Sequence, residues 1–330
     1  MTAASTLRAP LLEGVGRIGF GAWQIGDDAW GAVDEGAALG ALEAAADAGV
    51  TFYDTADVYG DGRSERLVGH FLAERGDPRL VVATKMGRRV EQVPENYTPE
   101  AFREWLDRSR ENLGVERIPL VQLHCPPTEV YYRPEVFDAL DALVADGVIA
   151  HYGVSVEKVE EALKAIEYPG VASVQIIFNL FRQRPAALFL GEARRRGVAV
   201  IVRVPLASGL LTGKLSADST FAETDHRHFN RHGESFDVGE TFAGVPFEAG
   251  LAAVEELRPL VPGGWSLAAF ALRWILMHDA VTATIPGARN PDQARANAAV
   301  AALPPLDDAT LARAAEIYAQ RIAPYVHQRW

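Results

Sequence analysis

The chain has 330 residues, a length that suits one large α/β barrel or two domains of medium size. Its formal net charge of −12 argues against a nucleic-acid-binding surface, which would need clustered lysine and arginine, but it does not exclude a local basic pocket for a phosphate. A single cysteine, Cys125, excludes an intrachain disulfide, and 48% hydrophobic residues are ample for the core of a soluble globular protein.

The sequence carries no signal for export or membrane insertion. Residues 1–8 lack the apolar core of a signal peptide. The most apolar later stretch, residues 198–211, is interrupted by Arg203 and Pro205 and is too short to span a bilayer. We therefore expect a cytoplasmic protein that binds neither membranes nor nucleic acid.

Short apolar segments alternate with helical patterns along the whole chain. Strands are expected at residues 17–23, 51–55, 80–85, 120–124, 149–155, 173–178, 199–205 and 281–285. Most of them are apolar almost throughout, which is typical of parallel strands that are covered on both faces. Eight strand-then-helix units without an internal linker favour a single (β/α)8 TIM barrel over residues 1–330 rather than two domains.

The intervening segments show helical periodicity. Thr98 and Pro99 are a suitable N-cap and first residue for a helix whose apolar positions start at Phe102. Further apolar stripes predict helices around residues 67–72 and 136–144. The residues before Arg17 are expected to form a small N-terminal hairpin that closes the floor of the barrel.

One long polar segment, residues 215–246, follows the seventh predicted strand. A loop of this length in a compact domain is usually functional or mobile, so we expect a mobile lid on the catalytic face. Asp225, His226, His228 and His232 invite a metal interpretation. Their spacing fits no compact helical or hairpin site, so no metal is expected.

Polar residues end three of the predicted strands, where a (β/α)8 barrel builds its active site. These are Asp54, Lys85 and His124, and Tyr59 follows Asp54 by five residues. Each has a simple packing explanation alone, but the four together favour catalysis. Reduction of a carbonyl group needs a proton donor, which Tyr59 can supply if the Lys85 ammonium lowers its pKa from about 10. Asp54 would hold Lys85, and His124 would orient the carbonyl oxygen.

A longer motif surrounds two of these residues. The sequence Gly-Val-Thr-Phe-Tyr-Asp-Thr-Ala-Asp-Val-Tyr-Gly at residues 49–60, followed by Ser-Glu-Arg-Leu-Val-Gly at 64–69, resembles the best-known signature of aldo-keto reductases. The resemblance covers nearly the whole chain. It implies a (β/α)8 fold, a nicotinamide cofactor bound without a Rossmann domain, and Asp54, Tyr59, Lys85 and His124 as the catalytic tetrad.

The same resemblance implies a cofactor site for NADPH, with NADH as a weaker alternative. Ser155 and Gln175 would hold the carboxamide, although Val156 stands where the family usually has asparagine. Arg203 occupies the place of an aromatic that stacks on the nicotinamide in many relatives, and a salt-bridged barrel arginine is the competing interpretation. A cation there would disfavour the oxidised ring.

The remaining cofactor residues follow by position. The nicotinamide would be bordered by Gly21, Ala22 and Trp23. The pyrophosphate would lie along Pro205, Leu206, Ser208, Gly209, Leu211, Gly213 and Lys214. The adenosine end would be bound by Ile285, Gly287, Arg289, Gln293 and Asn297. Among these, Arg289 favours NADPH, because it follows the predicted strand and precedes a helix N-terminus that attracts anions. The substrate pocket is expected at Trp23, Trp30, Tyr59 and His124.

We therefore expect a reductase that acts on a small-molecule aldehyde or ketone. A second hypothesis is a cofactor-binding regulatory subunit, like the potassium-channel β subunits of the same fold. A third is a barrel lyase or isomerase in which Lys85 forms a Schiff base. Residues 325–330 are expected either to fold over the mouth of the barrel or to be disordered.

Overall fold

The computed structural model describes residues 6–26, 28–31 and 34–330. Eight parallel strands pair in chain order, from β1 to β8. Their bounds are β1 Phe20–Gly21, β2 Phe52–Asp54, β3 Val81–Met86, β4 Ile118–His124, β5 Ile149–Ser155, β6 Val171–Ile177, β7 Ala199–Arg203 and β8 Ala283–Thr284. Parallel bridges from Ile18 to Thr284 and from Gly21 to Gly287 join the two ends of the sheet and close it. The fold is the predicted (β/α)8 barrel.

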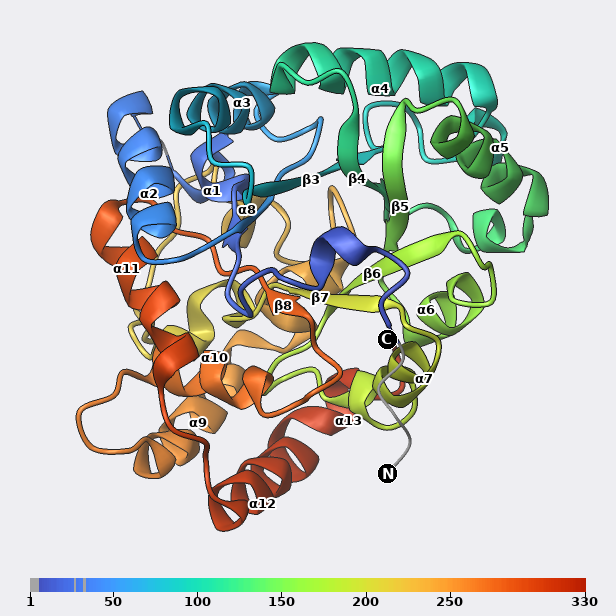
Figure 1. Ribbon diagram of the computed structural model, residues 1–330. Helices are drawn as coiled ribbons and strands as arrows, with labels where there is room; N and C mark the ends of the chain where they lie inside the picture. Colours follow the sequence, from blue (N-terminus) through green and yellow to red (C-terminus); the bar gives the residue numbers. More distant parts are fainter. Residues whose placement is uncertain (1–5, 27, 32–33) are drawn as a thin grey trace.

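Helices surround the strands (Figure 1). They are α1 Trp23–Gly26, α2 Glu35–Asp47, α3 Arg63–Arg75, α4 Pro99–Leu113, α5 Pro134–Ala145, α6 Val159–Ala165, α7 Phe189–Arg195, α8 His226–Phe229, α9 Phe247–Leu257, α10 Leu267–Leu276, α11 Pro291–Ala299, α12 Asp308–Ile317 and α13 Ala323–Val326. Thr98 accepts a hydrogen bond from Ala101 N and so caps α4, as predicted. None of the helices in the described residues is both long and apolar enough to cross a membrane.

The floor of the barrel differs from the prediction. Residues 6–16 contain no strand, and a short 3-10 helix, Pro10–Leu12, takes the place of the expected hairpin. Pro10 has no N–H group to contribute to a strand ladder. Ala9 and Leu12 are buried against strand residues such as Phe52 and Leu120, so this turn plugs the barrel (Figure 1).

The long polar segment, residues 215–246, is packed rather than extended. It forms α8 and two 3-10 turns, Val238–Glu240 and Phe242–Gly244. Five of its polar residues are buried, namely Asp225, His226, Asn230, Glu240 and Thr241. Its role as a lid stays a prediction.

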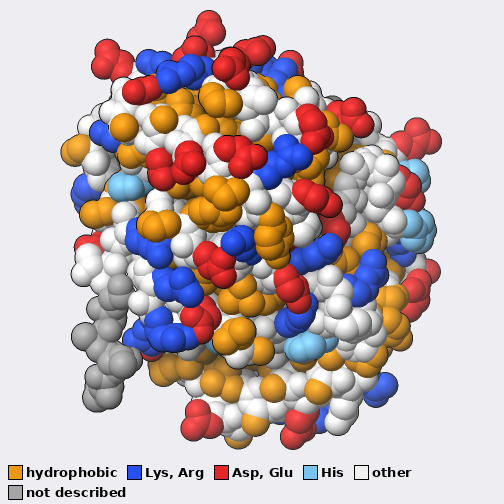
Figure 2. Space-filling view, turned by 90° about the vertical axis from the view of Figure 1, so that its right-hand side faces the viewer, with side chains coloured by type: hydrophobic (Ala, Val, Ile, Leu, Met, Phe, Trp, Pro, Cys, Tyr) orange, Lys and Arg blue, Asp and Glu red, His pale blue; other side chains and the backbone are white. Residues whose placement is uncertain are grey.

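The outer surface mixes charges of both signs. On the face shown in Figure 2, acidic and basic side chains lie interspersed with small groups of apolar ones. Neither sign of charge dominates this face.

Candidate active site

The strand ends bring the four predicted catalytic residues together. Asp54 ends β2, His124 ends β4, and Lys85 lies one residue before the end of β3. Lys85 Nζ donates to Asp54 Oδ1 at 2.5 Å, to Thr55 O at 2.8 Å and to Tyr59 Oη at 3.3 Å. The rings of Tyr59 and His124 meet edge to face, with 5.8 Å between their centroids.

The protonation of this group follows from burial and charge. Burial raises the pKa of Tyr59, and the Lys85 ammonium opposes this without overcoming it. Lys85 does lower the pKa of Tyr59, as predicted, but this effect is smaller than that of burial. Burial alone would lower the pKa of Lys85, yet Asp54 and Tyr59 raise it, so Lys85 is charged.

His124 is neutral at physiological pH. Burial lowers its pKa well below the usual value, and the nearby charges of Arg88, Lys85 and Arg203 lower it further. Its Nδ1 atom is buried and has no hydrogen-bond partner among the described residues. A neutral imidazole has one N–H donor and one acceptor nitrogen, so His124 beside Tyr59 can form a hydrogen bond with a ligand atom.

Asp54 is held on both sides. Its Oδ1 meets Lys85, while its Oδ2 accepts from the side-chain amides of Gln175, at 2.8 Å, and of Gln122, at 3.2 Å. Gln175, which the sequence predicted as a carboxamide contact, therefore also belongs to the support of the tetrad.

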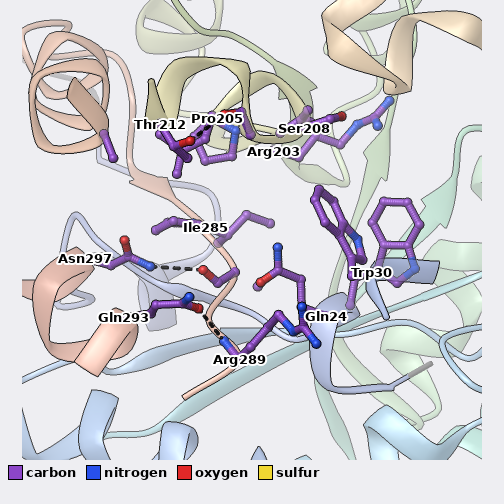
Figure 3. A pocket seen from close by; sticks show the side chains of 18 of the residues that line it. Gln24, Trp30, Arg203, Pro205, Ser208, Thr212, Ile285, Arg289, Gln293 and Asn297 are labelled. Atoms are coloured by element: carbon purple, nitrogen blue, oxygen red, sulfur yellow. Dashed lines mark hydrogen bonds between the residues drawn. The ribbon is translucent and has the colours of Figure 1, made fainter. Parts of the chain in front are cut away.

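A cavity of about 460 Å³ runs from this group toward α11. Figure 3 shows Arg203, Pro205, Ser208 and Thr212 on one side, and Gln24, Arg289, Gln293 and Asn297 on the other.

Most of the predicted site residues line this cavity. They are Gly21, Ala22, Trp23, Trp30, Asp54, Tyr59, His124, Gln175, Arg203, Pro205, Leu206, Ser208, Gly209, Lys214, Ile285, Gly287, Arg289, Gln293 and Asn297. Lys85, Ser155, Leu211 and Gly213 do not line it; Lys85 lies behind Tyr59, and the Ser155 hydroxyl accepts a weak hydrogen bond from Cys125.

The far end of the cavity is organised by the start of α11. Asn290 caps this helix by accepting from Gln293 N, as predicted. Arg289 N donates to Gln293 Oε1 at 2.9 Å, and Asn297 donates to Gly287 O at 3.1 Å (Figure 3). A helix N-terminus with an arginine beside it is suited to an anion.

Aromatic rings form the wall next to Tyr59. Trp23 stacks on the Tyr59 ring with 5.7 Å between centroids, and Trp30 meets Trp23 edge-on at 5.5 Å. The ring centroid of His226, from the long segment, lies 5.0 Å from that of Trp23 and 4.3 Å from that of Trp30. The predicted substrate pocket is thus largely apolar on this side. Trp23 was expected to end a strand but instead begins α1, which turns its ring toward Tyr59.

Arg203 is a salt-bridged barrel arginine, as the alternative interpretation of the sequence has it, and it also lines the cavity. Its Nη2 lies 2.8 Å from Glu157 Oε2, and its Nη1 lies 3.1 Å from Glu240 Oε2. Glu240 also pairs with Arg88 at 2.6 Å. Stacking of Arg203 on a nicotinamide stays a prediction.

The sequence analysis missed several residues of the cavity wall. They are Gln24, Val204, Thr212, Leu215, Arg227, Glu240, Ser266, Ala268, Pro286 and Ala296. Some adjoin predicted residues and could have been included by proximity. Arg227 and Glu240 belong to the aperiodic segment, where no sequence pattern indicates which side chains face inward.

Comparisons with known proteins agree with this architecture. A model of the aldo/keto reductase family matches residues 17–319. An aldo-keto reductase of Bacillus subtilis, YhdN, is 30% identical over 285 residues, covering 85% of this chain and 83% of that protein. The NADH-specific methylglyoxal reductase of Escherichia coli is 27% identical over 317 residues, covering 90% of this chain and 93% of that one.

Two solved structures are similar along almost their whole length. The glycerol dehydrogenase of Gluconobacter oxydans is 32% identical, with a TM-score of 0.76 and coverage of 99% of this chain and 97% of that one. An aldo-keto reductase of Klebsiella pneumoniae in complex with NADPH has the same fold at 23% identity, with a TM-score of 0.68 and 96% of both chains covered. Since the family match extends from before β1 to beyond α12, this chain belongs to the aldo-keto reductase family of oxidoreductases.

Proposed function

We propose that the protein reduces an aldehyde or a ketone to an alcohol with a hydride from NADPH, a reaction of the alcohol dehydrogenase type. The observation that carries this proposal is the position of Tyr59 Oη. It lies 3.3 Å from the Lys85 ammonium, on the wall of a cavity that continues to Arg289. A proton donor and an anion site at the two ends of one cavity suit a carbonyl group and a phosphorylated cofactor.

Tyr59 donates the proton that the carbonyl oxygen gains. The ammonium of Lys85 stabilises the phenolate that remains, and Asp54 keeps Lys85 charged and in place. His124, being neutral, hydrogen-bonds the carbonyl oxygen and orients it toward Tyr59. Such a positioned proton transfer accelerates a reaction by roughly 10²–10⁴-fold.

The cavity residues suit NADPH, which when bound supplies the hydride that no side chain can provide. Arg289 and the start of α11 hold the 2′-phosphate. Gly209, whose φ of +98° favours glycine, lets the backbone approach the pyrophosphate.

The relatives bear on the cofactor and the substrate. One relative is named as NADH-specific, so membership of the family does not by itself imply a preference for NADPH. The preference expected for this chain rests on Arg289 in the cavity wall. Methylglyoxal and glycerol, the compounds in the names of two relatives, are small and oxygenated. A substrate panel should therefore begin with small aldehydes, ketones and hydroxyketones.

The test is a fluorescence titration of the protein with NADPH and NADH, followed by the loss of NADPH absorbance with this panel. We expect tight NADPH binding, weaker NADH binding and turnover of at least one carbonyl compound. Tight binding without turnover of any of them would instead support a cofactor-binding regulatory subunit. Absence of binding to either nucleotide would refute the proposal.

A further inference from the structure

Two arginines and two glutamates form a network beside the tetrad: Arg203 and Glu240 are buried, and Arg88 and Glu157 nearly so. Burial raises the pKa of Glu157 to about 8, so Glu157 is mostly protonated at neutral pH. Glu240 joins the two arginines, at 2.6 Å from Arg88 Nη2 and 3.1 Å from Arg203 Nη1. Glu157 lies 2.8 Å from Arg203 Nη2 and 3.3 Å from Arg88 Nη2. Each side chain is at most 15% exposed. The low dielectric of such a site makes every charge in it effective over several ångströms.

Only two of these four side chains line the cavity, and they have opposite charges. Arg203 ends β7, and Glu240 comes from the long segment that follows it. Arg88 and Glu157 stand behind them. The charges of Arg88 and Arg203 contribute to the lowered pKa of His124, so the network acts electrostatically on the place where His124 and Tyr59 would meet a ligand.

The backbone that carries Glu240 is held by contacts with neighbouring segments, while its carboxylate is held by the two arginines. Ser208 Oγ donates to Glu240 O at 3.2 Å. The neighbouring Gly239 lies so close to the Trp330 ring that an added Cβ would approach Trp330 Cε2 to 2.8 Å. Burial alone would raise the pKa of Glu240, but the charges of Arg88 and Arg203 outweigh it and lower that pKa, so Glu240 is ionised.

The two forms of a nicotinamide cofactor differ by one charge. The oxidised ring is a cation, whereas the reduced ring is neutral. Arg203 alone would repel the oxidised ring and leave the reduced one almost unaffected. A fixed carboxylate beside Arg203 has the opposite effect.

We propose that Glu240 is a specificity-determining residue for the oxidation state of the cofactor. Its carboxylate, paired with Arg203 on the cavity wall, stabilises the oxidised nicotinamide and lets the site accept NADP⁺ as well as NADPH. The inference rests on the proposed function, because it requires the nicotinamide to lie beside Arg203. It differs from the simpler expectation that an arginine at this position disfavours the oxidised ring.

The test compares the dissociation constants of NADP⁺ and NADPH for the wild type and three variants. Glu240→Gln removes the charge on the cavity wall and should raise the ratio of the NADP⁺ constant to the NADPH constant by up to about tenfold, because Glu157 can ionise in its place only behind that wall. Glu240→Asp keeps the charge and should keep the ratio near that of the wild type, even if both constants rise. Arg203→Met removes the opposing cation and should lower the ratio.

A matched control is Glu192→Gln, which removes one carboxylate from α7, where Glu192 pairs with Arg195 away from the cavity. This control should leave the ratio unchanged, and thermal unfolding of each variant reports whether it folds. If Glu240→Gln does not fold, the opposite shift expected for Arg203→Met still tests the charge argument.

The outcomes separate the inference from the proposed function. Equal weakening of both cofactor forms in Glu240→Gln would show a merely structural role and overturn the inference while leaving the reductase proposal intact. An unchanged ratio in Arg203→Met would overturn it too. If the wild type binds neither form, the proposed function is wrong and the inference fails with it.

Discussion

The side-chain amide of Gln175 donates a hydrogen bond of 2.8 Å to Oδ2 of Asp54. Gln175 also lines the cavity, so one side chain connects the support of Lys85 to the place where a ligand would lie. Gln122 donates to the same oxygen, at 3.2 Å, but does not line the cavity. The two glutamines therefore form a natural pair for separating support of the tetrad from contact with the cofactor.

We predict that Gln175→Met and Gln122→Met both lower kcat, by roughly tenfold, because a hydrogen bond to a charged group contributes about 1.5–3 kcal/mol. Only Gln175→Met should also weaken NADPH binding. Steady-state kinetics and a fluorescence titration of both variants measure the two effects. Equal NADPH affinities in the two variants would mean that Gln175 does not contact the cofactor.

The second prediction concerns the proton donor. Tyr59→Phe removes the phenol oxygen that lies 3.3 Å from Lys85 Nζ, and should lower kcat by roughly 10²–10⁴-fold. NADPH affinity should change little, because the ring that stacks on Trp23 remains. Tyr325→Phe, at an exposed tyrosine, is the control. Ordinary turnover by Tyr59→Phe would exclude this tyrosine as the acid.

The third prediction concerns the adenosine end. Arg289→Ala should weaken NADPH at least tenfold more than NADH, because only NADPH carries the 2′-phosphate that a charged hydrogen bond would hold. Arg295→Ala is matched to it, since Arg295 lies on α11 but pairs with Asp292 and does not line the cavity. Binding titrations with both nucleotides decide the matter. A uniform loss for NADPH and NADH would assign Arg289 a structural role instead.

The sequence could predict features that depend on the spacing of apolar residues and on position within a strand or helix. Asp54 and His124 end apolar segments, and the carboxyl ends of parallel strands meet at one edge of a barrel. The N-cap Asn290 was predictable because its side chain satisfies a backbone N–H of the helix that it precedes. In each case the information lies within a few neighbouring residues.

Other features depend on contacts between distant parts of the chain. Arg88 and Glu240 are 152 residues apart in sequence, and nothing near Glu240 indicates that it turns inward. The pKa of Tyr59 likewise results from two opposing effects, burial and the charge of Lys85. Their balance depends on how deeply Tyr59 is buried, which no local sequence pattern indicates. The hairpin prediction was wrong because a proline turn can plug the floor as well as two strands can.

A fourth prediction follows from the buried His226. Burial lowers its pKa to about 4, while an unfolded chain keeps it near 6.5. The unfolded state therefore binds the proton first, and folding stability decreases as the pH falls from about 6.5 to about 4, by roughly 3 kcal/mol in total. His226→Gln should lose this part of the pH dependence.

Urea unfolding at the two ends of this pH range measures the difference in the free energy of unfolding. His70→Gln, at a half-exposed histidine of α3, is the control and should keep the wild-type slope. If His226→Gln keeps that slope too, His226 is not the group that titrates.

The last prediction concerns Trp330, which is buried and fixes the turn that carries Glu240. Its Nε1 donates to Asp237 Oδ1 at 2.9 Å, its ring lies 4.2 Å from the Arg182 guanidinium, and it packs on Gly244. Trp330→Ala should lower the free energy of unfolding by about 3–5 kcal/mol, as is usual when a buried tryptophan is truncated. Because the turn would no longer be fixed, NADP⁺ affinity should fall more than NADPH affinity, in the same direction as in Glu240→Gln. Trp330→Phe keeps most of the packing and should recover the affinity ratio while losing the hydrogen bond. If Trp330→Ala destabilises the protein but leaves the ratio at the wild-type value, the position of Glu240 does not depend on Trp330.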